Sequence, residues 1–247
     1  MDEILNKQDY ENLHTDFLVP LNIKIENKYF LDEIKKYKKW NLWGDKFQEL
    51  NRYALPLVNL NGNLYNDEDP SCWPLDRWNF KKFGYKDTPS DFNYFYNKIL
   101  NDDIDDFLLE TSFKKPTSLL NIPSLNPLNP IKKYMHRSCI LKWQKESRFY
   151  PHVDTWYPVR WLRIWGTSHP ENIKLRFKSF DGEEKIWNDI NKEYENYKII
   201  KNIEPGRLYI FDSIKWHDAI CIKNISYHYF ISLSLESYDF LKENIEK

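Results

Sequence analysis

Two histidines and one aspartate form the clearest chemical pattern in this chain. His152 and Asp154 are separated by one residue, and His217 follows much later in the sequence. Two imidazoles and one carboxylate are the protein ligands that leave half of an octahedral iron(II) open to other ligands. Because side chains alternate across a β-strand, an H-x-D spacing places both groups on one face, where a single metal can reach them. The three residues are therefore candidate metal ligands and catalytic residues.

A single histidine is more often a hydrogen-bonded structural or surface residue than a metal ligand. We assign that ordinary role to His14, His136 and His169. The strand context distinguishes the others. Pro151 places His152 near the beginning of a predicted strand, and an alternating segment at 206–212 is followed by a short turn and then His217. These positions are where a metal-binding jelly roll would need its ligands.

The second half of the sequence has the pattern of an all-β fold. Eight short segments with turn residues between them predict a sandwich or jelly roll. They are residues 135–143, 148–154, 159–166, 172–180, 184–188, 206–212, 217–223 and 227–236. Asp181-Gly182 between two of them is the strongest hairpin signal. We therefore expect a jelly-roll catalytic core across residues 131–240.

The first 130 residues are predicted to be a helical and loop-rich region of the same single domain. Apolar and aromatic residues spaced near the helical period predict helices within 1–50 and across 91–113. An apolar run at 52–60, ended by an Asn-Gly-Asn turn signal, predicts a strand at the edge of the main fold. The chain is thus expected to be mainly β, with helices on the N-terminal side.

Charge and composition exclude several classes of function. Lys and Arg number 36 against 37 Asp and Glu and are scattered along the chain, so there is no electrostatic footprint for nucleic acid. The sequence contains no run of about 18 apolar residues, the length that would predict a membrane span. Aromatic residues make up 17% of the chain and supply a substantial core without disulfides.

The cysteines and the first residues bear on the cellular compartment. The three cysteines are widely spaced and form no C-x-x-C pair, which argues against a disulfide framework and a structural zinc site. They are Cys72, Cys139 and Cys221. The beginning of the sequence, Met1-Asp2-Glu3-Ile4, lacks the basic and apolar segments of a signal peptide. We therefore expect a soluble cytoplasmic protein.

Taken together, these residues resemble the jelly-roll 2-oxoglutarate and iron(II)-dependent dioxygenases, in particular the aspartyl/asparaginyl β-hydroxylase group with its proline cis-hydroxylase relatives. The matching segments are residues 136–141, 151–154, 160–163 and 206–212 before His217, with a weaker match at 52–57. The resemblance implies a double-stranded β-helix, cupin-like, in which His152, Asp154 and His217 hold Fe(II). It also implies that 2-oxoglutarate and O2 take the remaining positions.

The activity implied by the resemblance is hydroxylation of an unactivated C–H bond, with succinate and CO2 as co-products. Halogenating relatives replace the carboxylate ligand with a small residue, whereas this chain keeps Asp154, which favours hydroxylation. The implied substrate is an amino acid or a side chain within a peptide. Fold alone does not establish an activity, so the site must carry the assignment.

A dicarboxylate cosubstrate also needs a cation for its far end. In the family, an arginine commonly lies about ten residues beyond the distal histidine, but here His228 occupies that neighbourhood. His228, if protonated, Arg160, Arg163 and Ser138 are the candidate cosubstrate-binding residues. Because Arg160 and Arg163 are three apart, at most one points inward from a regular strand unless a bulge intervenes. Its spacing from the H-x-D motif slightly favours Arg160.

Candidate substrate-binding residues lie on both sides of the H-x-D motif. Arg137 resembles a position that holds carboxylates in the family, and Trp156 and Tyr157 could cover the iron, although aromatic residues at such turns commonly only pack. Residues 66–90 predict a long loop that could form a substrate lid or could simply be surface. Its notable side chains are Asp69, Trp73, Arg77 and Trp78.

Two other classes remain open. A cupin-type metalloenzyme could use the same ligands without 2-oxoglutarate, and the missing distal arginine is its best support. A non-catalytic jelly-roll binding module would make the ligand pattern accidental. The sequence has no phosphate-binding P-loop, no G-x-S-x-G nucleophile elbow and no dinucleotide-binding glycine motif, which argues against those enzyme classes.

Overall fold

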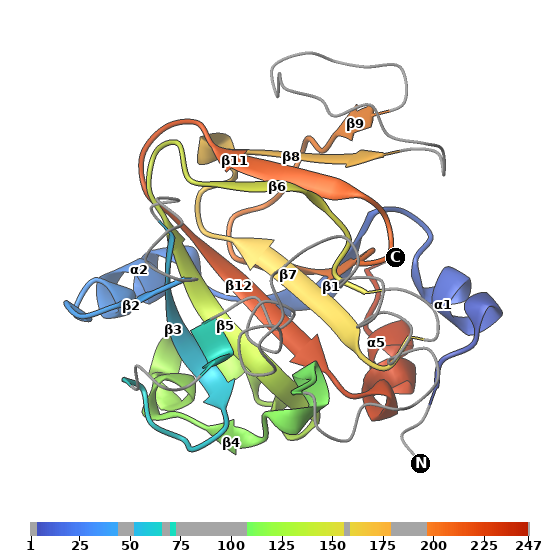
Figure 1. The fold of residues 1–247 in the computed structure, drawn as a ribbon, viewed down its shortest axis with the longest axis horizontal. Coiled ribbons are helices and arrows are strands. Elements are labelled where there is room, and N and C mark those ends of the chain that lie inside the picture. The colour runs from blue at the N-terminus through green and yellow to red at the C-terminus, as the bar shows by residue number, and fades with distance from the viewer. Residues whose placement is uncertain are drawn as a thin grey trace, which may run out of the picture.

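Two antiparallel β-sheets form the framework of the protein (Figure 1). The computed structural model describes residues 4–43, 52–65, 70–72, 108–155, 159–178 and 197–246. The larger sheet contains β1 (Leu18–Lys24), β2 (Asn41–Leu42), β3 (Arg52–Asn59), β4 (Lys115–Pro116), β5 (Met135–Trp143), β7 (Leu162–Thr167), β10 (Arg207–Phe211) and β12 (Ser226–Leu233). The smaller sheet contains β6 (Arg148–His152), β8 (Ile173–Lys178), β9 (Tyr197–Ile199) and β11 (His217–Cys221).

The strand order is that of a double-stranded β-helix. In the larger sheet the order is β1-β10-β7-β12-β5-β3-β2, with β4 paired to β3, and in the smaller sheet it is β6-β11-β8-β9. The chain therefore passes repeatedly from one sheet to the other as it runs from β5 to β12. β10, β7, β12 and β5 of the larger sheet form one layer, and the four strands of the smaller sheet form the other. Alternation between two such layers defines a jelly roll. The predicted fold class, mainly β with N-terminal helices, is confirmed.

Each face of the larger sheet packs against a different apolar cluster. One face packs against α1 (Lys7–Leu13), α2 (Asn27–Ile34) and α5 (Tyr238–Glu243), whose buried side chains share a cluster with Tyr229 and Ile231 of β12. The other face meets the smaller sheet, and there Trp165 packs with Phe177 and Phe211. Alternate residues of each strand thus point into the space between the sheets.

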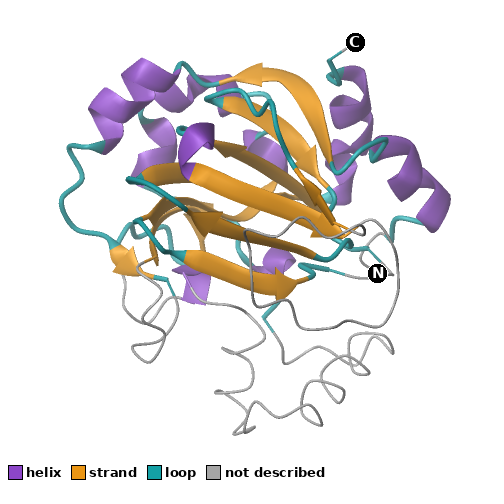
Figure 2. Ribbon diagram, turned by 90° about the horizontal axis from the view of Figure 1, so that it is seen from above, coloured by secondary structure: helices purple, strands orange, loops and turns teal. Residues whose placement is uncertain are grey.

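Seen from above, the strands occupy the centre of the molecule and the helices lie around them (Figure 2). Short 3-10 helices complete the covering: η1 (Pro70–Cys72), η2 (Glu110–Ser112), η3 (Ser118–Asn121), η4 (Pro123–Leu128), η5 (Lys132–Tyr134), η6 (Pro170–Asn172) and η7 (Leu235–Ser237). Within the part of the chain that the structure describes, no helix combines the length and the apolar character that crossing a membrane requires.

The prediction of helices within residues 1–50 is wrong for β1, which is an edge strand paired with β10. Val19, Leu21 and Ile23 are buried at every second position, a strand period that the surrounding helical pattern obscured. Pro20 is tolerated because an edge strand has a partner on one side only.

Strand boundaries in the core differ from the predictions at two points that matter for the site. The segment predicted at 148–154 ends at His152, and the segment predicted from 159 begins at Leu162. Arg160 therefore lies before β7, whereas Arg163 lies within it. The predicted strand at 184–188, its hairpin turn at 181–182 and most of the helix predicted at 91–113 fall outside the described residues.

Candidate metal centre

The two histidines of the candidate centre face each other across a strand pair. His152 is the last residue of β6, and His217 is the first residue of β11, its antiparallel partner directly opposite. Their ring centroids are 4.4 Å apart. His152 was expected near the beginning of its strand, but Pro151 is accommodated at the end because β6 is an edge strand.

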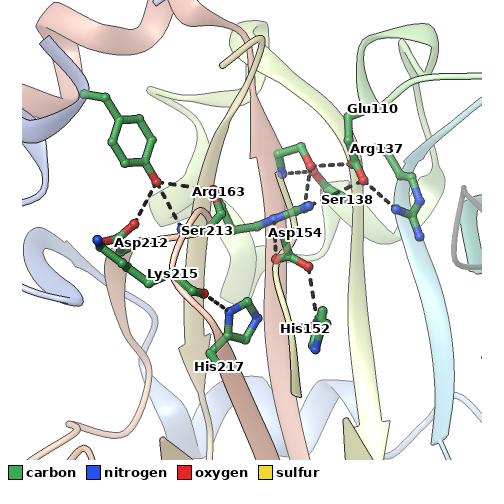
Figure 3. Close-up of polar contacts among 12 residues, drawn as sticks. Glu110, Arg137, Ser138, His152, Asp154, Arg163, Asp212, Ser213, Lys215 and His217 are labelled. Carbon is green, nitrogen blue, oxygen red and sulfur yellow. Dashed lines mark hydrogen bonds and ion pairs between the residues drawn. The ribbon is translucent and has the colours of Figure 1, made fainter. Parts of the chain in front are cut away.

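Asp154 completes the cluster from the turn that follows β6. One potential ligand atom from each of His152, Asp154 and His217 lies within 4.8 Å of those of the other two. Figure 3 shows the three side chains converging from the two chain segments. The predicted ligands are thus brought together, although Asp154 reaches the site from a turn and not from the strand face that the H-x-D spacing suggested. One metal ion could contact all three.

The orientation of His217 is determined by the backbone of its own turn. Its Nδ1 lies 2.8 Å from the carbonyl oxygen of Lys215. A carbonyl only accepts, so Nδ1 carries the proton and Nε2 keeps its lone pair. Burial lowers the pKa of His217 to about 3, with a further contribution from His152. The ring is therefore neutral at neutral pH, and its Nε2 could bind a metal ion.

Asp154 is held in its ionised form. Burial alone would raise its pKa, but the positive charge of Arg163 and the hydrogen bond from His152 outweigh this and keep the pKa well below its usual range. One carboxylate oxygen lies 3.4 Å from Nε2 of His152, and the other lies 3.4 Å from Nε of Arg163. The carboxylate thus has one oxygen on the histidine side and one on the arginine side.

Backbone hydrogen bonds join the two ligand-bearing turns. The carbonyl oxygen of Ser213 accepts from the amides of Asp154 at 2.9 Å and Thr155 at 3.2 Å. The hydroxyl of Tyr10, on α1, accepts from the Ser213 amide and donates to Asp212, both at 3.1 Å. A side chain from the first helix therefore braces the turn that precedes His217. The sequence carried no signal for this contact.

Arg163 points inward from β7 and is engaged by several partners. It donates through Nη1 to Ser232 at 2.5 Å and through Nη2 to Glu110 at 3.4 Å, and its guanidinium lies 3.8 Å from the centre of the Phe230 ring. Asp154 is its further ionic partner. These contacts explain why the Arg163 side chain points inward, a question that the sequence left open. They leave it poorly placed to hold an external carboxylate.

The other residues predicted before the H-x-D motif are also engaged within the protein. Arg137 donates to Glu110 at 2.6 Å and to the carbonyl of Ser71 at 3.1 Å. Ser138 donates to the carbonyl of His136 at 2.9 Å and accepts from the amide of Ser232 at 3.2 Å. Glu110 was not singled out from the sequence, because nothing local marks it. Its two arginine partners lie far away along the chain.

His228 lies between the sheets in an aromatic setting. It is 1% exposed, and its ring packs against Trp143 and Trp165 with centroid distances of 4.5 and 5.8 Å. Neither ring nitrogen has a hydrogen-bond partner within the described part of the chain. Burial lowers the pKa of His228 to about 3, so the ring is neutral here, contrary to the protonated form considered from the sequence. Buried polar groups normally have hydrogen-bond partners, so both nitrogens of His228 remain able to bond to a further polar group.

The remaining predicted residues divide into two groups. Arg160 is buried at 5% exposure, in the irregular segment before β7. The others lie outside the described residues: Trp156 and Tyr157 beside the motif, and Asp69, Trp73, Arg77 and Trp78 in the predicted lid.

Comparison with known proteins gives similarity of structure only. No family model matches the chain, and no curated protein matches its sequence. An oxidoreductase of the 2OG-Fe(II) oxygenase family from Burkholderia pseudomallei is 11% identical, with 94% of this chain and 92% of that one covered and a TM-score of 0.41. A prolyl hydroxylase from Trichoplax adhaerens, in complex with a hypoxia inducible factor oxygen degradation domain peptide fragment, is 10% identical, with 98% and 84% covered and a TM-score of 0.35. These values are too low to assign a shared activity, so the function is argued from the site itself.

Proposed function

We propose that this chain is an iron(II)- and 2-oxoglutarate-dependent oxygenase that hydroxylates an unactivated C–H bond in an amino acid or a peptide side chain. The observation that carries the proposal is the convergence of His152, Asp154 and His217 at one end of the β6–β11 strand pair of a jelly roll. This donor set suits iron(II) and leaves coordination positions for a cosubstrate and oxygen. When bound, iron(II) with 2-oxoglutarate and O2 supplies C–H hydroxylation and yields succinate and CO2.

The chemistry of the donor set fits a divalent metal. His217 is neutral and has its Nε2 lone pair aimed away from the Lys215 carbonyl, and Asp154 is ionised. Neither of these two groups therefore needs to lose a proton before it binds a cation, whereas His152 must give up its contact with Asp154 if Nε2 is to bind the metal. Ser213 ties the two ligand-bearing turns together, so little ordering is left to be done on binding.

For the far carboxylate of 2-oxoglutarate we propose His228. It lies on the inward face of β12, and Trp143 and Trp165 shield it from water. Its unpartnered nitrogens could donate one hydrogen bond to a carboxylate while neutral and two after proton uptake. A carboxylate beside the ring would raise the pKa of His228 from its low value, because the opposite charge favours the imidazolium. Arg160 is the second candidate for this role.

The contacts that Arg137 makes within the protein argue against a role in substrate binding. Its guanidinium is buried and bound to Glu110. A substrate carboxylate could reach Arg137 only after Glu110 released it. The proposed substrate class, an amino acid or peptide, is therefore supported by the resemblance of the sequence segments.

Turnover of the cosubstrate tests the proposal directly. With Fe(II), ascorbate and O2, the purified protein should convert 2-oxoglutarate to succinate, and His152→Ala should abolish the conversion. His169→Ala is the matched control, because His169 is not one of the three clustered residues and bonds to Ser168. Absence of succinate from the iron-loaded parent protein across candidate amino acids and peptides would contradict the proposal.

A metal-dependent enzyme that does not use 2-oxoglutarate is the alternative with specific structural support. The position proposed for the far carboxylate of the cosubstrate carries a neutral histidine, His228, and the candidate Arg163 is engaged by Glu110 and Ser232. Calorimetric titration of the manganese-loaded protein with 2-oxoglutarate separates the two functions. Binding heat supports the oxygenase, whereas its absence supports the alternative.

A further inference from the structure

Glu110 is linked to the candidate metal centre through Arg163. It begins the short helix η2, before β5, and is 5% exposed. Its carboxylate accepts from Arg137 at 2.6 Å and from Ser232 at 2.6 Å, and Arg163 lies 3.4 Å away. Figure 3 shows a row of side chains that runs from Arg137 through Glu110 and Arg163 to Asp154.

Arg163 is shared between two carboxylates. Its Nη2 faces Glu110, and its Nη1 bonds to Ser232, which in turn donates to Glu110. Only Nε faces Asp154, at 3.4 Å and without a formed hydrogen bond. The stronger contacts of Arg163 are therefore on the Glu110 side. Glu110 competes with Asp154 for the charge of this arginine.

The row forms a balanced set of buried charges. Two arginines, Arg137 and Arg163, face two carboxylates, Glu110 and Asp154, and these side chains are at most 15% exposed. Water screens buried charges poorly, so the removal of one charge strongly changes the electrostatic energy of the others. Without the charge of Glu110, two arginines would oppose the single carboxylate that the centre offers to a metal.

We propose that Glu110 is a positioning residue that makes the centre able to bind a divalent cation. It neutralises Arg137 and draws Arg163 away from Asp154, so that the Asp154 carboxylate remains available to the metal. This inference rests on the proposed metal site and adds to it a residue that touches neither metal nor substrate.

Affinity for Co(II), followed by its visible absorption under anaerobic conditions, tests the inference without any turnover. Glu110→Gln has nearly the same shape and removes the negative charge, although one of the two accepting oxygens becomes an amide donor. The dissociation constant for Co(II) should rise by about tenfold or more, the range seen for outer-shell partners of metal ligands. The control Glu204→Gln removes an exposed acid that pairs with Lys24 and Arg207 and should leave the affinity unchanged.

Charge restoration separates this role from a packing role. The double variant Glu110→Gln/Arg137→Gln again has as many buried positive as negative charges in the row, and its Co(II) affinity should return most of the way to the parent value. A packing role predicts the opposite, because two buried contacts are then lost. Near-ultraviolet circular dichroism confirms that each variant is folded. A double variant as weak as Glu110→Gln would overturn the inference.

Arg137→Gln alone provides a test that does not depend on Glu110→Gln folding. It leaves Glu110 and Asp154 to share Arg163, so Co(II) affinity should rise or stay equal to that of the parent. Weaker Co(II) binding by this variant would overturn the inference, as would parent-like binding by Glu110→Gln. If the parent protein itself bound no Co(II), the proposed metal site would fail together with the inference, which is a different and recognisable result.

Discussion

Nδ1 of His217 lies 2.8 Å from the carbonyl oxygen of Lys215, and this contact determines which ring nitrogen faces the candidate metal. The carbonyl belongs to the same turn that Ser213 ties to Asp154. Orientation of one ligand and placement of another are thus coupled through a few backbone bonds. Because these bonds depend on Tyr10 and Asp212, residues remote from the metal are expected to affect it.

Removal of the Tyr10 hydroxyl should loosen this turn. Tyr10→Phe loses the hydrogen bonds to Asp212 and to the Ser213 amide and leaves both groups buried. We expect the free energy of unfolding to fall by about 1–3 kcal/mol, the usual cost of unsatisfied buried groups. Urea denaturation of the metal-free protein measures it. Tyr29→Phe, at an exposed tyrosine, should have little effect. Equal stability of the two variants would contradict this role of Tyr10.

Asp212 should make the protein less stable as the pH rises towards neutrality. Burial raises the pKa of its carboxyl to about 6 from the usual 3.8. A folded-state pKa above the unfolded value means that the contribution to stability is complete below pH 3.8 and is lost as the pH rises through 6.

The variant Asp212→Asn keeps a partner for Tyr10 and removes this titration. At pH 7.5 it should be more stable than the parent by about 1–3 kcal/mol, given about 1.4 kcal/mol per pKa unit. The difference between variant and parent should shrink as the pH falls from 6 to 4. Thermal denaturation across this range checks both points. A variant less stable at pH 7.5, or a difference that does not depend on pH, would be inconsistent with a protonated Asp212 in the fold.

Binding of 2-oxoglutarate should depend on His228 and take up a proton. The free ring is neutral because burial lowers its pKa, and a carboxylate partner favours the charged form. His228→Leu should weaken 2-oxoglutarate binding by about tenfold or more while metal affinity is unchanged. Calorimetry in buffers of different ionisation enthalpy measures the proton uptake. Parent-like affinity in His228→Leu would transfer the role to another residue, with Arg160 the next candidate.

The stability of the fold at acid pH provides a second test of the burial of His228. A histidine pKa lowered to about 3 in the folded state contributes stability that is present above the unfolded pKa of 6.5 and is lost as the pH falls from there towards 3. His228→Leu should therefore lose less stability than the parent between pH 6.5 and 4. Parallel stability curves for the two proteins would show that His228 is not buried as a neutral ring.

The parts of the fold that follow local rules could be predicted from the sequence. The strand predicted at 135–143 coincides with β5, and period-two alternation supplied most of the other core strands. The ligand cluster was predictable because two of its members are neighbours in the sequence. The position of Asp154 was less predictable, because this residue lies in a turn whose backbone bonds to the carbonyl of Ser213, far away along the chain.

The features that sequence reasoning missed depend on long-range contacts or on short shifts of boundary. Glu110 meets Arg137 and Arg163 only after the chain has folded, and no periodic pattern connects them. The choice between Arg160 and Arg163 depended on β7 beginning at Leu162, three residues later than expected. β1 was hidden because its short alternating run is surrounded by helical segments.

The iron content of the protein tests the central claim most directly. After anaerobic equilibrium dialysis against Fe(II), the parent protein should hold about one iron per chain. His152→Ala, Asp154→Ala and His217→Ala should each lose it, while the control His169→Ala retains it. A parent protein that binds no iron, or one whose iron survives all three substitutions, would contradict the account of this cluster as a metal centre.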